Sequence, residues 1–238
     1  MTDLISVARR LRAAVSDLQF RSPVTHVYNP LGYAWSPHRE YLERYGAGRP
    51  EVVLVGMNPG PWGMVQTGVP FGDVEMVRNW LGINSPVRRP PVEHPRRPIQ
   101  GFACRRREVS GQRLWGWARH TFGSPDKFFA RFFILNYCPL CFLESSGRNR
   151  TPDRLSAAER GPLLAVCDRS LVQSVEVLRP RYLLGVGRFP YGRVAAALSH
   201  SGGQLGMVPH PSPASPQANR GWGRLMEAAL RSLGIRVP

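Results

Sequence analysis

Four short runs of β-branched and other apolar residues place the strongest constraint on how this chain folds. The runs are Glu51–Gly56, Phe132–Asn136, Tyr182–Val186 and Leu205–Val208. Each is too short for a helix and is bounded by Gly, Asn or Pro, which is typical of a buried strand. Helical stretches lie between the later runs, and this alternation favours a parallel sheet covered on both sides. The predicted fold class is therefore α/β, as a single three-layer α/β/α domain with a central, mainly parallel four-stranded sheet.

The expected helices cover 154–178, 188–199 and 217–233. Thr151 is placed to cap the first helix and Pro152 to open its first turn. Pro190 is expected to delay the start of the second helix. Within residues 1–27, apolar residues follow the 4/3/4/3 spacing of one helix face, which predicts an N-terminal helix packed on the domain. These residues are Leu4, Ala8, Leu11, Val15 and Leu18.

With 238 residues the chain is long enough for one well-cored domain, and we expect a single domain over 1–238. Residues 84–113 differ from the rest, because they carry five prolines and three arginine clusters. The clusters are Arg88–Arg89, Arg96–Arg97 and Arg105–Arg107. We interpret 84–113 as a long, basic surface insertion that contacts a DNA backbone, with an ordinary solvated loop as the alternative.

The formal net charge of +16 makes a polyanion the expected partner, with nucleic acid ahead of an anionic membrane surface. A generally basic proteome or a basic tail is the simpler explanation. No run of about 18 apolar residues occurs, so we expect no membrane-spanning segment. The spacing of Cys138 and Cys141 is seen in metal and iron–sulfur sites, but the pair lies in an apolar run where cysteines are commonly buried. We expect no metal and no cofactor.

Two Gly- and Pro-rich stretches follow the first and last predicted strands. The first is GMNPGPWGMVQTGVPFG (Gly56–Gly72), and the second is HPSPASPQANRGW (His210–Trp222). Ligands of a doubly wound sheet bind beyond the carboxyl ends of its strands, which is where both stretches begin. The first stretch is not a P-loop, because Gly-Lys-Ser/Thr is missing. A tightly turned, restricted backbone of this kind suits the close approach of a ligand.

These two stretches resemble the motifs of the single-strand-selective monofunctional uracil-DNA glycosylase family, a branch of the uracil-DNA glycosylase superfamily. The segments ILNYCPL (Ile134–Leu140) and SGRNRTP (Ser146–Pro152) also resemble family segments, and the likeness covers about Tyr28 to Leu233. The resemblance implies DNA base-excision repair by hydrolysis of the N-glycosidic bond of uracil, leaving an abasic site. It extends to 5-substituted uracils such as 5-hydroxymethyluracil.

The resemblance implies two catalytic residues. Asn58 holds the attacking water; an asparagine cannot take a proton at neutral pH, so it positions the water and is no strong base. His210 lies against the O2 atom of the base, where a hydrogen bond strengthens as negative charge develops. Lys127 is the only lysine, so a Schiff-base lyase step has few candidate amines and one-step hydrolysis is favoured.

The resemblance also implies the residues that bind the base. Asn136 offers one donor and one acceptor side by side, which is complementary to uracil and reversed for cytosine. Phe71 stacks on the flipped base, an interaction worth roughly 1–3 kcal/mol. Met57 and Gly60 line the pocket wall near the 5-position. Without the motif, Asn136 would be a turn residue and Phe71 a core residue.

The second stretch is expected to supply the DNA-binding wedge that fills the gap left by the extruded base. Its implied DNA-binding residues are Ser212, Pro213, Ala214, Ser215, Pro216, Gln217 and Arg220. A helix opening at 217–220 would meet phosphate at its N-terminus. Ala214-Ser215 stands where the vertebrate-type pattern has Arg-Asn, so wedge strength and the preference between duplex and single strands stay open. Trp62 replaces the common phenylalanine.

Other functions fit the same residues. A glycosylase of deaminated purines such as xanthine or hypoxanthine belongs to the same superfamily, and a non-catalytic, basic α/β nucleic-acid-binding protein is an alternative from another class. For the expected glycosylase the partner is DNA, single- or double-stranded, with no membrane and a monomeric chain. We expect it in the cytoplasm with the nucleoid in a prokaryote, and in the nucleus in a eukaryote.

Overall fold

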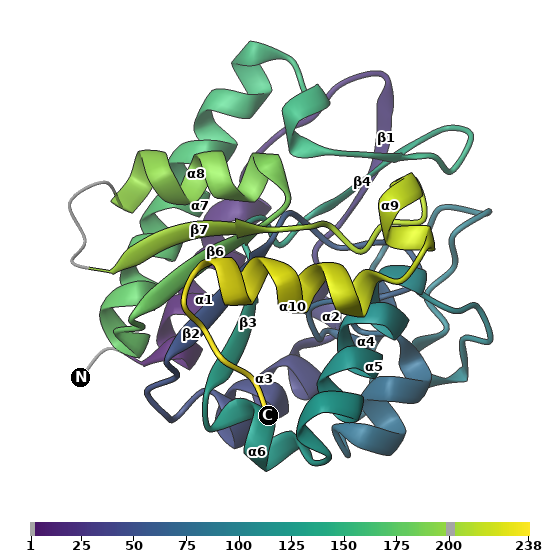
Figure 1. The fold of residues 1–238 in the computed structure, drawn as a ribbon. Coiled ribbons are helices and arrows are strands. Elements are labelled where there is room, and N and C mark those ends of the chain that lie inside the picture. Colours follow the sequence, from purple (N-terminus) through teal and green to yellow (C-terminus); the bar gives the residue numbers. More distant parts are fainter. Residues whose placement is uncertain (1–2, 199–202) are drawn as a thin grey trace.

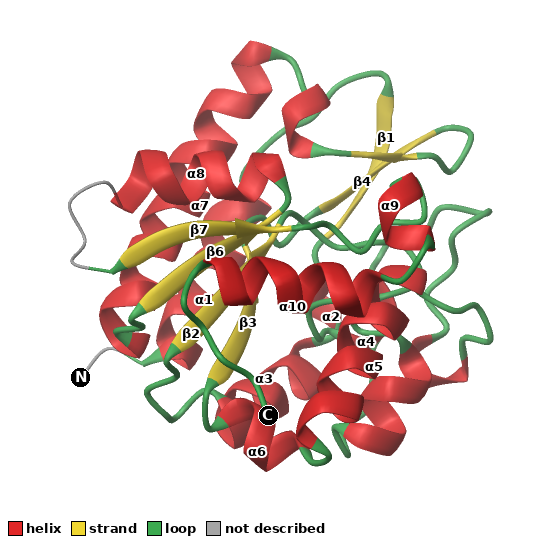
Figure 2. Cartoon of the chain, in the orientation of Figure 1, coloured by secondary structure: helices red, strands yellow, loops and turns green. Residues whose placement is uncertain are grey.

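The computed structural model describes residues 3–198 and 203–238, with a four-stranded parallel sheet at its centre (Figures 1 and 2). The strands are β2 (Val52–Gly56), β3 (Phe132–Asn136), β6 (Tyr182–Val186) and β7 (Gln204–Val208), in the spatial order β3-β2-β6-β7. Every residue of β2 and β6 is buried, which explains why these strands are apolar throughout rather than alternating. The predicted α/β class and four-stranded sheet are confirmed.

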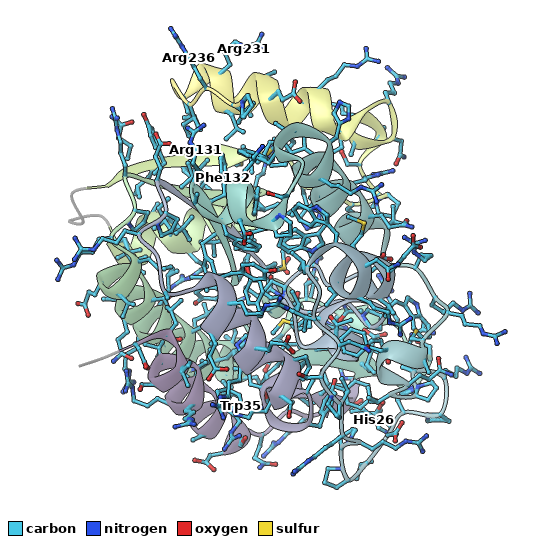
Figure 3. The ribbon with its side chains drawn as sticks, turned by 90° about the horizontal axis from the view of Figure 1, so that it is seen from below. His26, Trp35, Arg131, Phe132, Arg231 and Arg236 are labelled. Atoms are coloured by element: carbon cyan, nitrogen blue, oxygen red, sulfur yellow. The ribbon has the colours of Figure 1, made fainter. Side chains whose placement is uncertain are left out.

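Helices cover both faces of this sheet. The α-helices of the described residues are α1 (Leu4–Ser16), α2 (Pro30–Tyr33), α3 (Trp35–Tyr45), α4 (Met64–Thr67), α5 (Val109–Phe122), α6 (Pro125–Phe129), α7 (Ala157–Leu178), α8 (Arg188–Leu198), α9 (Pro216–Asn219) and α10 (Trp222–Ser232). Helix α10 crosses one face, and α1 and α7 lie beyond the opposite face (Figures 1 and 3). The predicted apolar stripe of α1 is buried at Leu4, Ala8, Leu11 and Val15, whereas Leu18 follows the end of the helix. No helix in the described ranges has the length and apolar character needed to cross a membrane.

A second, antiparallel sheet was not predicted from the sequence. It consists of β1 (Val24–Tyr28), β4 (Cys141–Glu144) and β5 (Asn149–Arg150), in the order β1-β4-β5. These strands are two to five residues long, and β4 continues the apolar run that follows β3. Such short segments give too little alternation to identify them.

Three predictions about the helices are wrong. Ser156, and not Thr151, caps α7: its side chain accepts from the Glu159 N–H while Glu159 reaches back to the Ser156 backbone. Pro190 does not delay α8, because it lies in the first turn, where no N–H is needed. The expected 217–233 helix is divided into α9 and α10. The predicted end of α8 at residue 199 lies outside the described residues.

The irregular part of 84–113 ends at Glu108, which caps α5 by accepting from the backbone N–H groups of Ser110 and Gly111. The last five residues of the predicted insertion are therefore helical. The side chains of His94 and Ile99 are buried within the irregular part, so this segment packs against the domain rather than standing free in solvent.

Candidate functional site

The two Gly- and Pro-rich stretches meet at the carboxyl edge of the parallel sheet. Asn136 ends β3 directly beside Gly56, the last residue of β2. His210 follows β7 by two residues, on the same edge. The ring of Phe71, from the first stretch, lies 6.4 Å from the ring of His210, measured between centroids. Residues far apart in the sequence are thus brought together at the position that the sequence predicts.

The side chain of Asn58 is fixed in one orientation by the backbone. Its Nδ2 donates to the carbonyl oxygen of Leu140, at 3.1 Å, and to that of Pro59, at 3.4 Å. Within residues 3–198 and 203–238, no protein group donates to its Oδ1. This oxygen is a hydrogen-bond acceptor that a water molecule at the site can use.

The imidazole of His210 is held by its own loop. The backbone N–H of Ser212 donates to His210 Nδ1 at 3.0 Å, so Nδ1 carries no proton in this arrangement. Burial lowers the pKa of His210 below its ordinary value of 6.5, because desolvation disfavours the charged ring. The ring is therefore neutral at pH 7, and its proton lies on Nε2.

The side chain of Asn136 is half-buried, and among the described residues it makes only one polar contact, a weak one. Its Nδ2 donates to the sulfur of Met64 at 3.2 Å, and a thioether is a poor acceptor. The lack of a side chain at Gly56 is required here, since a Cβ would overlap Asn136 Oδ1 and lie 2.7 Å from Cε2 of Phe71. Asn136 and Phe71 therefore share the space above the end of β2.

Met57 and Gly60 lie in the loop after β2, and neither is fully exposed. The carbonyl of Met57 accepts from the N–H of Cys138, which joins this loop to the chain after β3. The carbonyl of Gly60 accepts from Gly63 and Val65 within its own loop. These backbone bonds fix the course of the loop before any ligand arrives.

The predicted wedge is a short turn braced from several sides. Its residues Pro213, Ala214, Pro216, Gln217 and Arg220 are exposed, while Ser212 and Ser215 are half-buried. Ser215 N–H donates to the carbonyl of Ser212, and Ser215 Oγ caps α9. Because α9 is only four residues long, the helix expected to present its N-terminus to phosphate is a single turn.

Two important residues were not identified from the sequence. Arg113 donates to the carbonyl of Pro211, at 2.9 Å, and to Oδ1 of Asn219, at 2.7 Å, so it anchors the wedge from α5. Trp115 donates to the carbonyl of Phe71 at 3.0 Å. Both contacts join segments about 40 or 100 residues apart, and no local spacing signals them.

The arginines of 84–113 divide into two groups. Arg107 forms two bonds of 2.9 Å to the buried carboxylate of Asp73 and also pairs with Glu75, so carboxylates of the protein itself neutralise its charge. The guanidinium carbons of Arg97 and Arg106 instead lie 5.0 and 5.6 Å from the ring centroid of Trp62. In the described ranges, no carboxylate lies within ion-pair distance of these two arginines.

The four cysteines are free thiols and all are buried. Burial raises the pKa of Cys141 far above its ordinary value, which keeps the thiol protonated and unlike a metal ligand. In the part of the chain that the structure describes, no group of three or more His, Cys, Asp or Glu side chains is arranged to hold a metal.

Comparisons with known proteins identify the family of this chain and a solved structure of the same fold. The family model described as "Uracil DNA glycosylase superfamily" matches residues 43–233. The chain is 49% identical over 234 residues to a single-strand selective monofunctional uracil DNA glycosylase of Mus musculus, covering 95% of this chain and 82% of that protein. It is also 49% identical over 229 residues to the Bos taurus protein of that name, covering 95% and 84%. The crystal structure of wild-type Pedobacter heparinus SMUG2 has a TM-score of 0.68 at 15% identity, covering 98% of both chains, and shares the fold.

Proposed function

Since this chain belongs to the single-strand-selective monofunctional branch of the uracil-DNA glycosylase superfamily and excises uracil from DNA in base-excision repair, we propose that Asn58 and His210 together carry out the hydrolysis. Breaking the N-glycosidic bond builds positive charge on the sugar and negative charge on the departing base. Each residue acts on one of these charges.

Asn58 positions the water. Its Nδ2 is engaged with the Leu140 carbonyl, so the amide cannot turn and Oδ1 stays available to accept from the nucleophile. An amide does not take up the proton of the water, and the sugar develops much of its positive charge before the water attacks. The contribution of Asn58 is therefore placement rather than base catalysis.

His210 stabilises the departing base. The observation that carries this assignment is the bond from the Ser212 N–H to Nδ1, because it puts the imidazole proton on Nε2. Nε2–H donates to O2 of uracil, and this bond strengthens as the oxygen becomes anionic. A neutral donor stays available at pH 7, since burial holds the pKa of His210 low.

Asn136 and Phe71 select the base. The weak bond from Asn136 to the Met64 sulfur is readily exchanged for one to uracil O4, while Oδ1 accepts from N3–H. Cytosine presents the opposite pattern and would leave buried polar groups unpaired. Phe71 stacks on the base. Met57 and Gly60 lie at the 5-position, where the missing side chain of Gly60 leaves room for a substituent such as hydroxymethyl.

The wedge residues Ser212–Gln217 and Arg220 enter or border the gap left by the base. Ala214, one of the exposed side chains of this turn, is small and fills a duplex stack poorly. The enzyme therefore acts on single and double strands, with single strands favoured because no partner base needs replacing.

Trp62 with Arg97 and Arg106 contacts the DNA backbone. The enzyme works as a monomer where the genome lies, on the nucleoid in a prokaryote or in the nucleus in a eukaryote.

The test is a panel of oligonucleotides that each carry one lesion, in single- and double-stranded form. Uracil and 5-hydroxymethyluracil are expected to be released as free bases, with the strand intact until alkali is added. Thymine, xanthine and hypoxanthine are expected to be released far more slowly. Faster release of xanthine or hypoxanthine than of uracil would instead assign the pocket to deaminated purines.

A further inference from the structure

The backbone of Phe71 is held in a conformation that an aromatic residue rarely adopts. Its φ angle is +53°, in the left-handed region that favours glycine. A residue persists there only when the surrounding structure fixes it, and such residues concentrate at functional sites. The contacts that fix Phe71 therefore bear on how the site works.

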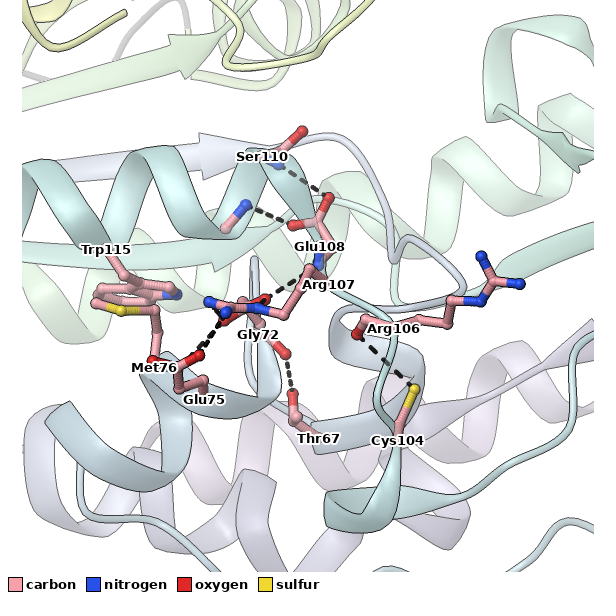
Figure 4. Close-up of polar contacts among 12 residues, drawn as sticks. Thr67, Gly72, Glu75, Met76, Cys104, Arg106, Arg107, Glu108, Ser110 and Trp115 are labelled. Carbon is pink, nitrogen blue, oxygen red and sulfur yellow. Dashed lines mark hydrogen bonds and ion pairs between the residues drawn. The ribbon is translucent and has the colours of Figure 1, made fainter.

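Two donors fix the carbonyl group of Phe71. The backbone N–H of Asp73 donates to it at 2.8 Å, and the indole Nε1–H of Trp115 donates at 3.0 Å. Figure 4 shows Trp115 and Gly72, the residue that follows Phe71. Trp115 is fully buried in α5. Gly111, one turn earlier, has no side chain, and a Cβ there would overlap the Phe71 oxygen. Helix α5 therefore accommodates this carbonyl in two ways: Gly111 leaves space for the oxygen and Trp115 donates a hydrogen bond to it.

The residues after Phe71 are fixed as well. Thr67 Oγ1 donates to the carbonyl of Gly72 at 3.0 Å. The carboxylate of Asp73 is fully buried and accepts from the Arg107 guanidinium and from the N–H of Glu108, at 2.9 and 3.0 Å. Hydrogen bonds from Thr67, Arg107 and Glu108 therefore hold the residues that follow Phe71. Among the described residues, Trp115 supplies the one side-chain donor that contacts Phe71 itself.

We infer that Trp115 is a positioning residue for base excision: its indole N–H holds the Phe71 backbone so that the ring is aligned with the base between Asn136 and His210. The inference rests on the proposed stacking role of Phe71. Because the ring lies against Gly56 and near His210, a shift of the carbonyl moves the ring relative to both. Trp115 itself does not touch the base.

The chain offers a matched control two residues along the same helix. Trp117 is 5% exposed, comparable with Trp115 at 0%, but its Nε1 has no hydrogen-bond partner in the described residues. Trp115→Phe and Trp117→Phe therefore remove similar buried volume, and only the first removes a hydrogen bond to Phe71. A second version of the test places the isosteric analogue β-(3-benzothienyl)alanine at position 115, which keeps the shape and lacks the N–H.

Single-turnover release of uracil is measured at a temperature where every variant is folded, together with the Kd for a tetrahydrofuran abasic oligonucleotide. Trp115→Phe and the analogue are expected to slow release about five- to tenfold, the size of one lost hydrogen bond, with Kd unchanged. Trp117→Phe is expected to release uracil at the wild-type rate, although its free energy of unfolding falls. In the Phe71→Ala background, Trp115→Phe is expected to cause no further loss, because it acts through Phe71.

Two results would overturn the inference. One is wild-type release by both the Trp115→Phe variant and the analogue; the other is an equal further loss from Trp115→Phe when Phe71 is already alanine, which would mean a general structural role. If Phe71 does not stack on the base, the Phe71→Ala variant is expected to keep full activity. That result would overturn both the stacking role and the inference about Trp115. Uracil excision by the wild-type chain is unaffected by either outcome.

Discussion

At position 210, one backbone hydrogen bond determines which imidazole nitrogen is a donor. Ser212 N–H points at Nδ1, and so the neutral ring has its proton on Nε2, the nitrogen that we propose contacts the substrate. Protonation of the ring would place a second proton at Nδ1, facing the Ser212 N–H. The cationic ring is therefore incompatible with the loop arrangement seen here, and burial disfavours it further.

This arrangement predicts the acid limb of the pH profile. The pKa of His210 lies below its ordinary value of 6.5, so kcat/KM is expected to stay level from neutral pH to about 6.5 and to fall at lower pH as the ring is protonated. His210→Gln should be slow throughout and should lack this acid limb. An acid limb of equal depth in His210→Gln would assign the titration to another group.

At the scale of elements, the loop after β2 is held by neighbours on several sides. Helix α3 contributes His38, whose Nδ1 lies 2.8 Å from the carbonyl oxygen of Gly68 at the end of α4. Full burial lowers the pKa of His38 to about 4, so the ring stays neutral and Nδ1–H donates. The loop that carries Asn58 and Phe71 thus depends on a histidine outside it.

The His38 contact predicts a loss of stability in mild acid. Below pH 6.5 the unfolded chain takes up a proton at this position, while the folded chain does not until about pH 4, so the free energy of unfolding decreases as the pH falls. The His38 contribution to this decrease between pH 6.5 and 5 is expected to be about 1.6 kcal/mol. Urea titrations at the two pH values measure it. His38→Asn should be less stable at pH 6.5 and should show a pH-dependent loss smaller by about that amount; an unchanged pH dependence would contradict the assignment.

Elements also show what the sequence can and cannot predict. The strands β2, β3, β6 and β7 were predicted to within one residue, because a buried parallel strand is an unbroken apolar run with turn residues after it. Asn58, Asn136 and His210 could be placed at one edge because strands of a parallel sheet end together. The antiparallel sheet, the break between α9 and α10, and the contacts of Arg113 and Trp115 depend on tertiary partners that local sequence does not specify.

At the scale of the whole molecule, the net charge of +16 comes mainly from arginines of two kinds, those paired with carboxylates and those without a carboxylate partner among the described residues. Side chains that end in nitrogen atoms extend into solvent around the surface of the protein (Figure 3). Some are paired, such as Arg39 with Glu43 and Arg107 with Asp73. Arg97 and Arg106 stack on Trp62 in the loop after β2, without a carboxylate nearby in the described ranges. An orientated, unneutralised guanidinium beside the catalytic loop is suited to a phosphate.

Salt dependence of DNA binding tests this assignment. Each phosphate contact contributes about 0.9 to the slope of log K against log salt for duplex DNA and about 0.7 for single strands. Arg106→Gln is therefore expected to lower the magnitude of the slope by about 0.9 on a duplex tetrahydrofuran oligonucleotide and by about 0.7 on a single-stranded one. Arg39→Gln changes the net charge equally but removes an already paired arginine, and its slope is expected to stay at the wild-type value. Equal slopes for the two variants would show that Arg106 meets no phosphate.

We propose that two loops far apart in the sequence, which carry Asn58 and His210, act on one glycosidic bond. The most direct measurement is the single-turnover rate of uracil release by Asn58→Ala and by His210→Ala, with the Kd for the abasic oligonucleotide measured in parallel. Each substitution is expected to slow release by at least about 100-fold, because each removes a group that acts on the transition state, while Kd stays at the wild-type value. Release at the wild-type rate by either variant would contradict the account.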